Sequence, residues 1–303
     1  MKRVEEPLFD TIGIIGVGLI GGSIGMAAKT HGLVRRVIGI GRDPQKLQRA
    51  KELAAIDDFT TDMLEGAAQC DLVIVCPPVR TVVPTIERIA PALKEGAIVT
   101  DVGSTKSEIC LGAEKVMPPG RHFVGGHPMA GLEASGVGSA TPYMFLNATY
   151  VITPTATTHL GALRKVVDLA EGLGAQVNLM KPEEHDRSAA VISHIPHILA
   201  ATILDLAAKE QSHNSKVFQL AAGSFRDLTR IASSPPELWR DICLSNSEAI
   251  CELLERYQVL LSAAREAIAA GDEAAVEGMF ENARQLKENY LGLKDQPKER
   301  SDL

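Results

Sequence analysis

The stretch "GVGLIGGS", residues 16–23, decides the fold of this chain. Its glycines at 16, 18 and 21 satisfy the pattern G-x-G-x-x-G. The apolar run Thr11–Ile15 precedes it, and the small residues Ser23–Thr30 that follow predict a helix. In this context the first glycine allows a tight turn, the second lets a pyrophosphate approach the backbone, and the third lets the helix pack on the strand. The stretch therefore predicts a dinucleotide-binding site at a helix N-terminus, where backbone N–H groups favour anions.

Strands and helices alternate along the rest of the N-terminal half. Short apolar runs at 37–40, 72–76 and 97–100 predict strands. Further strands are possible around Val124 and over 150–153 and 177–179. Asp43-Pro44 predicts the start of a helix, because aspartate is a good N-cap and proline suits the first helical position. A helix is also expected over 81–93, and Thr105 with Glu108 forms the capping-box pattern of another. This alternation predicts an α/β fold of the Rossmann type with a mostly parallel sheet.

The pattern changes near Met180-Lys181-Pro182. Beyond this point the apolar residues follow the helical period, and helices are expected over 183–209, 215–228, 236–262 and 272–290. We therefore expect two domains. Residues 1–181 form the dinucleotide-binding domain, and residues 182–303 form an all-helical domain for substrate binding and dimerisation.

Composition excludes several classes of protein. Of the 303 residues, 45% are hydrophobic and 23% are charged, which suits a globular protein with a substantial core. The net charge of −7 argues against a nucleic-acid partner. The chain has five cysteines, none at metal-ligand spacing, and this favours reduced thiols in the cytoplasm and no metal site. The start lacks the apolar region of a signal peptide, and no apolar run approaches the roughly 18 residues of a membrane span.

The candidate base is the histidine of "GGHPMAG", residues 125–131. Histidine can accept a proton near neutral pH, and glycine allows a backbone to pass close to a ligand. "TDVGSTK", residues 100–106, directly follows a predicted strand, so Ser104 and Lys106 are expected on the rim of the cofactor crevice. We expect His127 to reach the same rim in a loop that passes the nicotinamide.

Two stretches of the helical half carry further candidates. In "SHIPH", residues 193–197, His194 and His197 share a helix face, and Pro196 disturbs the helical hydrogen bonds. These histidines suit a substrate pocket, an interface without chemistry, or a metal pair, although no carboxylate or cysteine stands at ligand spacing. In "SFRDLTRIA", residues 224–232, two arginines four apart suit either an anion site or an exposed ion-pair face.

The five stretches at 16–23, 101–106, 125–136, 193–197 and 224–232 together resemble the prephenate/arogenate dehydrogenases of tyrosine biosynthesis. The likeness runs from about Thr11 to Tyr290. It implies a Rossmann-type domain followed by an all-α dimerisation domain of the 6-phosphogluconate dehydrogenase type, and a homodimer. A stand-alone form is expected, because no residues remain for a fused chorismate mutase or ACT domain.

The resemblance also implies a reaction. In this family a ring C–H gives a hydride to NAD or NADP, the hydroxyl on the same carbon gives its proton to a base, and the ring carboxylate leaves as CO₂. Prephenate then yields 4-hydroxyphenylpyruvate, and arogenate, the alternative substrate, yields tyrosine; some members accept both.

The family motifs imply roles for particular residues. His127 resembles the base, and Arg230 resembles the anchor of a substrate carboxylate. Ser104 resembles the residue that hydrogen-bonds both this histidine and the substrate hydroxyl. Asp227 resembles a residue that orients the basic cluster, while Leu132 departs from the small polar residue that often stands there. Further substrate-pocket residues are implied at His185, His194, His197 and Glu133.

Cofactor contacts are expected at Gly16, Gly18, Leu19, Ile20, Gly21, Arg42 and Asp43. In NAD-selective domains an acid at the end of the second strand binds the ribose hydroxyls. By register with the family, that position is Gly41 here, and Arg42 after it suits a 2′-phosphate. Asp43 fits better as a helix N-cap. The sequence therefore predicts a preference for NADP, with NAD also accepted.

Other functions are compatible with parts of the pattern. A β-hydroxyacid dehydrogenase or a pyrroline-carboxylate reductase shares the glycine loop and a helical second domain, but the stretches around His127 and Arg230 disfavour both. A redox-sensing protein that binds the dinucleotide without chemistry is disfavoured by the base candidate and the arginine anchor.

Overall fold

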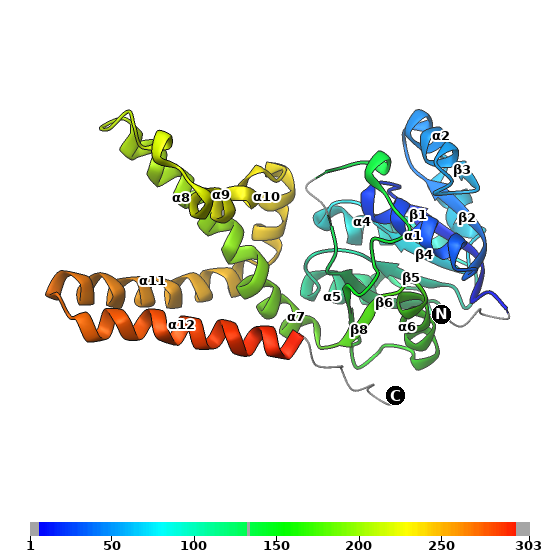
Figure 1. Ribbon diagram of the computed structural model, residues 1–303. Coiled ribbons are helices and arrows are strands. Elements are labelled where there is room, and N and C mark those ends of the chain that lie inside the picture. The colour runs from blue at the N-terminus through cyan, green and yellow to red at the C-terminus, as the bar shows by residue number, and fades with distance from the viewer. Residues whose placement is uncertain (1–5, 132–133, 295–303) are drawn as a thin grey trace. The chain divides into compact units, whose positions relative to one another are not determined.

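The computed structural model describes residues 6–131 and 134–294 (Figure 1). It contains two compact units, residues 1–250 and residues 251–303, which are described separately below.

A sheet of eight strands organises the first unit within the described residues. Its order is β3-β2-β1-β4-β5-β6-β7-β8, and every neighbouring pair is parallel except β6 with β7. The strands are β1 Phe9–Ile15, β2 Val34–Ile40, β3 Asp58–Thr60, β4 Leu72–Val75, β5 Ile98–Asp101, β6 His122–Pro128, β7 Thr149–Thr153 and β8 Gln176–Leu179. The predicted α/β fold is confirmed, although the short strand β3 was not expected.

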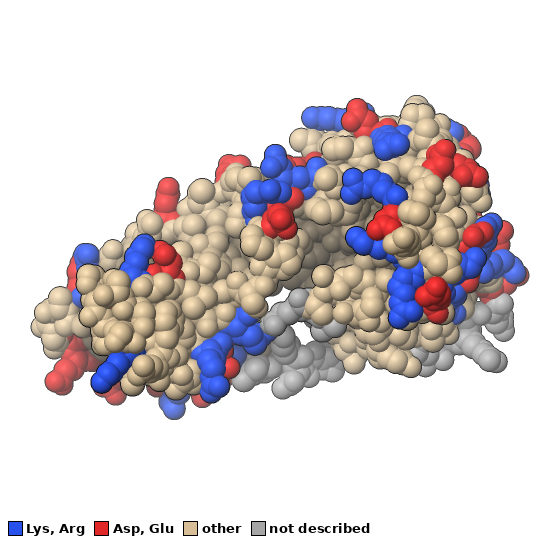
Figure 2. All heavy atoms as spheres, turned by 90° about the horizontal axis from the view of Figure 1, so that it is seen from above, with Lys and Arg blue, Asp and Glu red and all other residues tan. Residues whose placement is uncertain are grey.

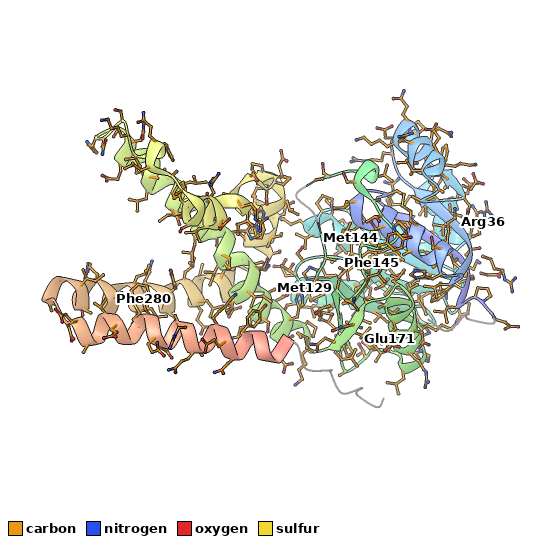
Figure 3. All side chains as sticks on the ribbon, viewed as in Figure 1. Arg36, Met129, Met144, Phe145, Glu171 and Phe280 are labelled. Atoms are coloured by element: carbon orange, nitrogen blue, oxygen red, sulfur yellow. The ribbon has the colours of Figure 1, made fainter. Side chains whose placement is uncertain are left out.

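Helices cover both faces of this sheet. They are α1 Leu19–Thr30, α2 Pro44–Glu52, α3 Met63–Ala68, α4 Val82–Ile89, α5 Ser107–Val116 and α6 Leu160–Gly172, with short 3₁₀ turns at Val79–Thr81, Ala90–Ala92 and Val137–Ser139. Strand residues alternate between two cores: Ile14 lies in one with Ile24 and Phe145, and Ile15 lies in the other with Ile86. Phe145 is fully buried in the α/β part (Figure 3). Apolar side chains on both sheet faces explain why the strands appear as continuous hydrophobic runs.

Beyond residue 181 the described chain is helical, as the sequence predicted. The elements are α7 Pro182–Ala189, a π-helical turn η4 Ala190–His194, α8 Ile195–Gln211, η5 Phe218–Leu220, α9 Gly223–Thr229, η6 Arg230–Ser233, α10 Pro236–Ser245, α11 Ser247–Ala270 and α12 Glu273–Lys294. The second unit consists of most of α11 together with α12.

Two predicted helices are divided in the structure. The helix expected over 215–228 is a 3₁₀ turn followed by α9, and the helix expected over 236–262 is broken at Asn246 into α10 and α11. Asn246 leaves helical geometry, with φ −130° and ψ 32°, and its side chain donates to the backbone oxygen of Asp186. A contact with a residue 60 positions away therefore ends α10, and the local pattern could not show it.

The glycines before His127 do not form the expected loop. Residues 125–128 belong to strand β6 and pair with β7. A Cβ on Gly125 would lie 2.5 Å from Oγ1 of Thr153, and one on Gly126 would lie 3.0 Å from the backbone oxygen of Asp101. These glycines therefore allow close packing of β6 against its neighbours, and the strand itself carries His127.

The capping box predicted at Thr105 and Glu108 is also absent. Lys106 is the N-cap residue of α5, and no side chain of the helix caps it. The carboxylate of Asp186 instead accepts hydrogen bonds from the backbone N–H groups of Lys106, at 2.7 Å, and Ser107, at 2.8 Å. Asp186 is 80 residues away in sequence from Lys106, which explains why a local motif was the wrong guide.

Lys106 is fully buried, although the sequence placed it on a crevice rim. Its Nζ donates to Oδ2 of Asp101, which is also fully buried, and to the backbone oxygen of Gly126 at 2.9 Å. Surface ion pairs are different in kind: Arg36, for example, is exposed and bonds Asp58 at 2.9 Å (Figure 3). Basic and acidic side chains are interspersed over the face shown in Figure 2. Exposed pairs stabilise a fold little, whereas a buried charge needs its partner.

Within the described residues, one helical stretch is long and apolar enough to span a membrane, judged by length and composition alone. It runs over Pro182–Gln211, and 28% of its most apolar window is buried. The fully buried His194 and the π-helical turn lie within it.

We predict that Lys106→Met lowers the free energy of unfolding by about 3–5 kcal/mol, because Asp101 is left as an unpaired buried charge. The measurement is urea unfolding at a fixed protein concentration. Arg49→Ala is the matched control, since Arg49 forms only an exposed pair with Glu52, and it is expected to cost less than about 1 kcal/mol. Equal losses in the two variants would contradict the importance of the buried pair.

Candidate active site

The glycine loop after β1 has the shape that a pyrophosphate needs. Gly16 has φ +87°, and a Cβ there would lie 3.1 Å from the carbonyl carbon of Cys76. A Cβ on Gly21 would lie 2.6 Å from the backbone oxygen of Gly16, so loop and helix are in close contact. By contrast, no described atom lies within 4 Å of a Cβ built on Gly18, the N-cap residue of α1.

The N-terminus of α1 is therefore open to an anion. No side chain caps it, and its first turn, which contains Leu19 and Ile20, holds no acidic residue. Its N–H groups and the helix dipole favour negative charge. These residues fit the diphosphate of a dinucleotide.

The residues expected at the ribose lie after β2. Asp43 is the N-cap of α2, and its Oδ1 accepts from the backbone N–H groups of Gln45, at 3.0 Å, and Lys46, at 3.2 Å. The predicted N-cap is thus confirmed. Arg42 is exposed, and a Cβ on Gly41 would make only ordinary contacts with Leu47, 3.4 Å away at the nearest.

A chain of hydrogen bonds begins at His127, near the end of β6. Its Nδ1 lies 2.8 Å from Nε2 of His185 in α7, and Nδ1 of His185 lies 2.8 Å from Oδ1 of Asp186. The two imidazole rings meet edge to face, with centroids 5.0 Å apart. Met129, two residues beyond His127, lies just after the strand (Figure 3). The structure thus brings together His127 and His185, which are 58 residues apart in sequence.

His194 is fully buried next to this series of hydrogen bonds. Its Nδ1 is 3.2 Å from Nδ2 of Asn246, an amide nitrogen that also donates to the backbone oxygen of Asp186. Since an amide nitrogen can only donate, Nδ1 of His194 is the acceptor and its hydrogen is on Nε2. The π-helical turn that ends at His194 lies directly before Pro196, whose ring cannot donate a backbone hydrogen bond. Such turns occur frequently at functional sites.

The surroundings keep His127 and His194 neutral. Burial, followed by the nearby His185, Lys106 and His194, lowers the pKa of His127 well below its usual 6.5. Burial likewise lowers the pKa of His194 to about 4, although the charge of Asp186 opposes this. A neutral imidazole can accept a proton, so His127 is ready to act as a base at neutral pH.

His194 and His197 share a contact with one aromatic ring, that of Trp239. The ring of His197 stacks on Trp239 with centroids 3.6 Å apart, and His194 meets the same indole at 6.1 Å. Burial lowers the pKa of His197, and the positive charge of Arg230 lowers it further. Arg230, the predicted carboxylate anchor, is therefore close enough for its charge to act on His197.

The remaining predicted residues lie as follows. Ser104 is half-buried in the loop between β5 and α5, and within the described residues no hydrogen bond joins it to His127. Asp227 is exposed in α9, and Arg230 is exposed at the start of η6. Glu133 and Leu132 lie outside the described residues. Three residues of this region were not predicted from the sequence, namely Asp186, Trp239 and Asn246. Of these, only Asp186 could have been proposed from the sequence, because it directly follows the candidate residue His185.

Comparison with known protein families assigns the chain. The model of the prephenate dehydrogenase nucleotide-binding domain matches residues 24–179, and the model of the prephenate dehydrogenase dimerization domain matches residues 181–282. The chain belongs to the prephenate dehydrogenase family. It is a nicotinamide-dependent oxidoreductase.

Individual relatives cover most of the chain. A prephenate dehydrogenase of Bacillus subtilis is 40% identical over 82% of this chain and 67% of its own length. A cyclohexadienyl dehydrogenase of Zymomonas mobilis is 33% identical over 95% of this chain and 97% of its own. The crystal structure of Aquifex aeolicus prephenate dehydrogenase in complex with hydroxyphenyl propionate and NAD⁺ is 32% identical with a TM-score of 0.87, and covers 95% of this chain and 99% of that one.

Proposed function

We propose that this chain is a prephenate dehydrogenase, which converts prephenate to 4-hydroxyphenylpyruvate by oxidative decarboxylation. The observation that carries the proposal is His127, a neutral imidazole on a strand of the nucleotide-binding sheet, engaged through Nδ1 by His185. Arogenate is the second candidate substrate. It is favoured by the likeness to a cyclohexadienyl dehydrogenase over 95% of this chain.

Each residue of the site has a proposed part in the reaction. A bound nicotinamide supplies the hydride acceptor. His127 takes the proton from the ring hydroxyl, and Ser104 hydrogen-bonds the same hydroxyl. Arg230 binds a substrate carboxylate with its planar guanidinium, and Asp227 orients it. The ring carboxylate leaves as CO₂, and its bonding electron pair completes the aromatic ring.

The substrate pocket is proposed to include His194, His197 and Glu133. His197 is partly exposed, and its Nδ1 donates to the backbone oxygen of Ser193, so in the neutral ring Nε2 can accept a hydrogen bond from a substrate hydroxyl. His194 is fully buried and is proposed to support the pocket from behind.

NADP is the preferred cofactor in this proposal, with NAD also accepted. The support is local: Gly41 offers no carboxylate to repel a 2′-phosphate, Arg42 is exposed beside it, and Asp43 is engaged as an N-cap. Gly16, Gly18, Leu19, Ile20 and Gly21 are proposed to hold the diphosphate.

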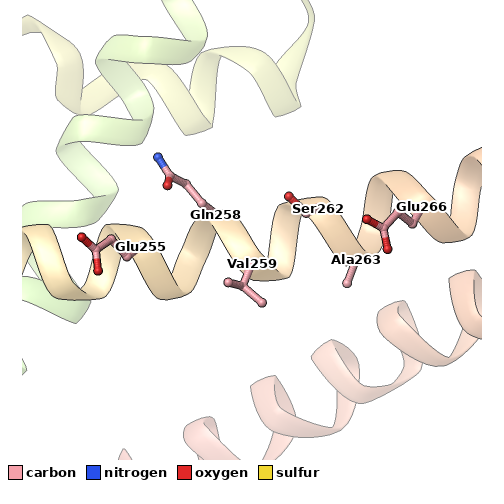
Figure 4. A pocket seen from close by; sticks show the side chains of 6 residues that line it. All are labelled: Glu255, Gln258, Val259, Ser262, Ala263 and Glu266. Atoms are coloured by element: carbon pink, nitrogen blue, oxygen red, sulfur yellow. The ribbon is translucent and has the colours of Figure 1, made fainter.

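A homodimer is proposed, supported by the match to a dimerization domain over residues 181–282. Helices α11 and α12 also expose many apolar side chains, and such surfaces mark protein interfaces. They are Val259, Leu260, Leu261, Ile268, Met279, Phe280, Leu286 and Tyr290. A shallow depression on α11 is lined by residues of that helix alone (Figure 4). A partner helix seated along α11 would cover it.

The remaining proposals concern organisation and location. A domain boundary near residue 181 is supported by the two family models, which meet between 179 and 181. A cytoplasmic location is supported by the five cysteines, all of which carry free thiols.

The assay that decides the function measures initial rates with prephenate and arogenate, each with NAD and NADP. In it, His127→Asn is predicted to lower kcat by about 10²- to 10⁴-fold with little change in KM, because a general base acts mainly in the transition state. The wild-type acidic limb is expected below pH 6.5, since the environment lowers the pKa of His127, and the variant should lack this limb. Near wild-type kcat in the variant would contradict the assignment, provided that its dinucleotide affinity shows an intact fold.

Gly41→Asp is predicted to shift the ratio of kcat/KM values toward NAD by about tenfold or more, because a carboxylate close to a 2′-phosphate costs more than about 1.4 kcal/mol. The new side chain has room beside Leu47. Arg42→Ala should weaken NADP use more than NAD use. A wild-type enzyme that strongly prefers NAD would show that this interpretation of the loop is wrong.

Light scattering of the wild-type protein at micromolar concentration is expected to give twice the mass of one chain. Leu260→Glu should shift the population toward the monomer, because it places a charge on the apolar face of α11. Leu160→Glu is the matched control: Leu160 is 77% exposed but lies on α6 of the first unit. A wild-type protein that scatters as a single chain would exclude the proposed homodimer.

A further inference from the structure

We propose that His185 and Asp186 are positioning residues, which hold His127 in the tautomer with its hydrogen on Nδ1 and so leave Nε2 as the basic atom. This inference rests on the proposed function, in which His127 is the base. It assigns His185 to His127 rather than to the substrate, and it gives Asp186 a part that the sequence did not suggest.

The carboxylate of Asp186 is the fixed end of the hydrogen-bond series that runs through His185 to His127. Its two oxygens accept the backbone N–H groups of Lys106 and Ser107, at the N-terminus of the ten-residue helix α5. Free N–H groups and the helix dipole stabilise negative charge at this position. Burial raises the pKa of Asp186, but hydrogen bonds from His185 and Ser107 outweigh burial and hold it below its usual range. Asp186 is therefore ionised and can only accept hydrogen bonds.

An acceptor at Asp186 sets the direction of every other bond. Nδ1 of His185 must donate to Oδ1, 2.8 Å away. In a neutral ring Nε2 then carries the lone pair, so it accepts from Nδ1–H of His127 at 2.8 Å. Nε2 of His127 is left with the free lone pair. The tautomer of the base is thus determined by a carboxylate two hydrogen bonds away.

The same contacts leave His185 no group for the substrate. Its side chain is only 2% exposed, and both ring nitrogens already bond protein atoms. His127, by contrast, is half-buried, and only its Nδ1 takes part in the series of hydrogen bonds with His185 and Asp186. When the hydroxyl O–H bond breaks and the proton binds Nε2 of His127, the new imidazolium still donates through Nδ1. No proton has to move to His185, whose ring dipole, oriented by Asp186, stabilises the charge.

Two substitutions of His185 separate the two bonds that it makes. In His185→Asn the amide occupies the place of Nδ1, so it can still donate to Asp186 but does not reach His127. In His185→Gln the longer side chain brings an amide oxygen to the place of Nε2, where it can accept from His127. His213→Asn is the matched control, because His213 is an exposed histidine of the same helical half.

Steady-state kinetics with prephenate should distinguish the two variants. We expect His185→Asn to lower kcat about 10- to 100-fold with KM changed less than about twofold. His185→Gln should recover most of this loss, and His213→Asn should match the wild type. If His185→Asn instead raises KM at unchanged kcat, His185 contacts the substrate and the proposal fails. If His185→Gln and His185→Asn lower kcat equally, His185 does not act by accepting a hydrogen bond at its Nε2 position, and the proposal fails as well.

A spectroscopic measurement tests the tautomer without any turnover. Long-range ¹H–¹⁵N spectra of histidine-labelled enzyme, assigned with His127→Asn, should show His127 protonated at Nδ1 in the wild type. In His185→Asn the signal should move toward the Nε2–H form that free imidazole side chains favour. Protonation at Nε2 in the wild type, as a doubly protonated His185 would impose, overturns the proposal. Absence of turnover with prephenate and arogenate would contradict the proposed function instead, and the spectrum would still decide the tautomer.

Discussion

The buried ion pair of Lys106 and Asp101 is the constraint on which the site depends. Both side chains are fully buried, and a buried charge is tolerated only when it is paired and hydrogen-bonded. Asp101, the last residue of β5, accepts from the backbone N–H groups of Gly103, at 2.8 Å, and Gly126, at 3.2 Å. Lys106 donates to the backbone oxygen of Gly126. The end of β5, the loop that carries Ser104 and the residue before His127 are therefore held together.

From this pair a second set of contacts extends into the helical half. The backbone N–H of Lys106 bonds Asp186, and Asp186 bonds His185, which bonds His127. Helix α7 is thereby attached both to the start of α5 and to the end of β6. The base of the proposed reaction is reached from two directions, through the strand on which it stands and through the ring to which it is bonded. This arrangement favours catalysis, because a general base must be held at hydrogen-bond distance from its substrate.

Electrostatics follow from the same packing. Burial and the charge of Lys106 disfavour a proton on His127, so the base is free at neutral pH. The π-helical turn before Pro196 places His194 where Asn246 can donate to it. The helix-disturbing Pro196 stands in the first turn of α8, directly after this π-helical turn. Asn246 in turn ends α10, so one side chain both terminates a helix and orients a histidine.

The sequence by itself determined the features that depend on neighbouring residues. The strand, glycine turn and helix predicted at 11–30, the alternation that builds the sheet, and the cap of α2 by Asp43 depend on local sequence. Their periodicity and capping contacts involve residues a few positions apart. His127 and Ser104 could be chosen as candidates for the same reason, since both stand next to predicted strands. Family resemblance then supplied their expected roles.

Only the tertiary structure decided the features that depend on residues far apart in the chain. Asp186 caps α5 across 80 residues, where a local capping box was expected. Gly125 and Gly126 form part of a strand rather than a loop, because Thr153 and Asp101 occupy the space of their missing side chains. Lys106 is buried rather than at a rim because Asp101 compensates its charge. The tautomer of His127 belongs to this second group, since it is determined through His185 by a carboxylate of α7, a helix that reaches the end of β6 only in the folded first unit.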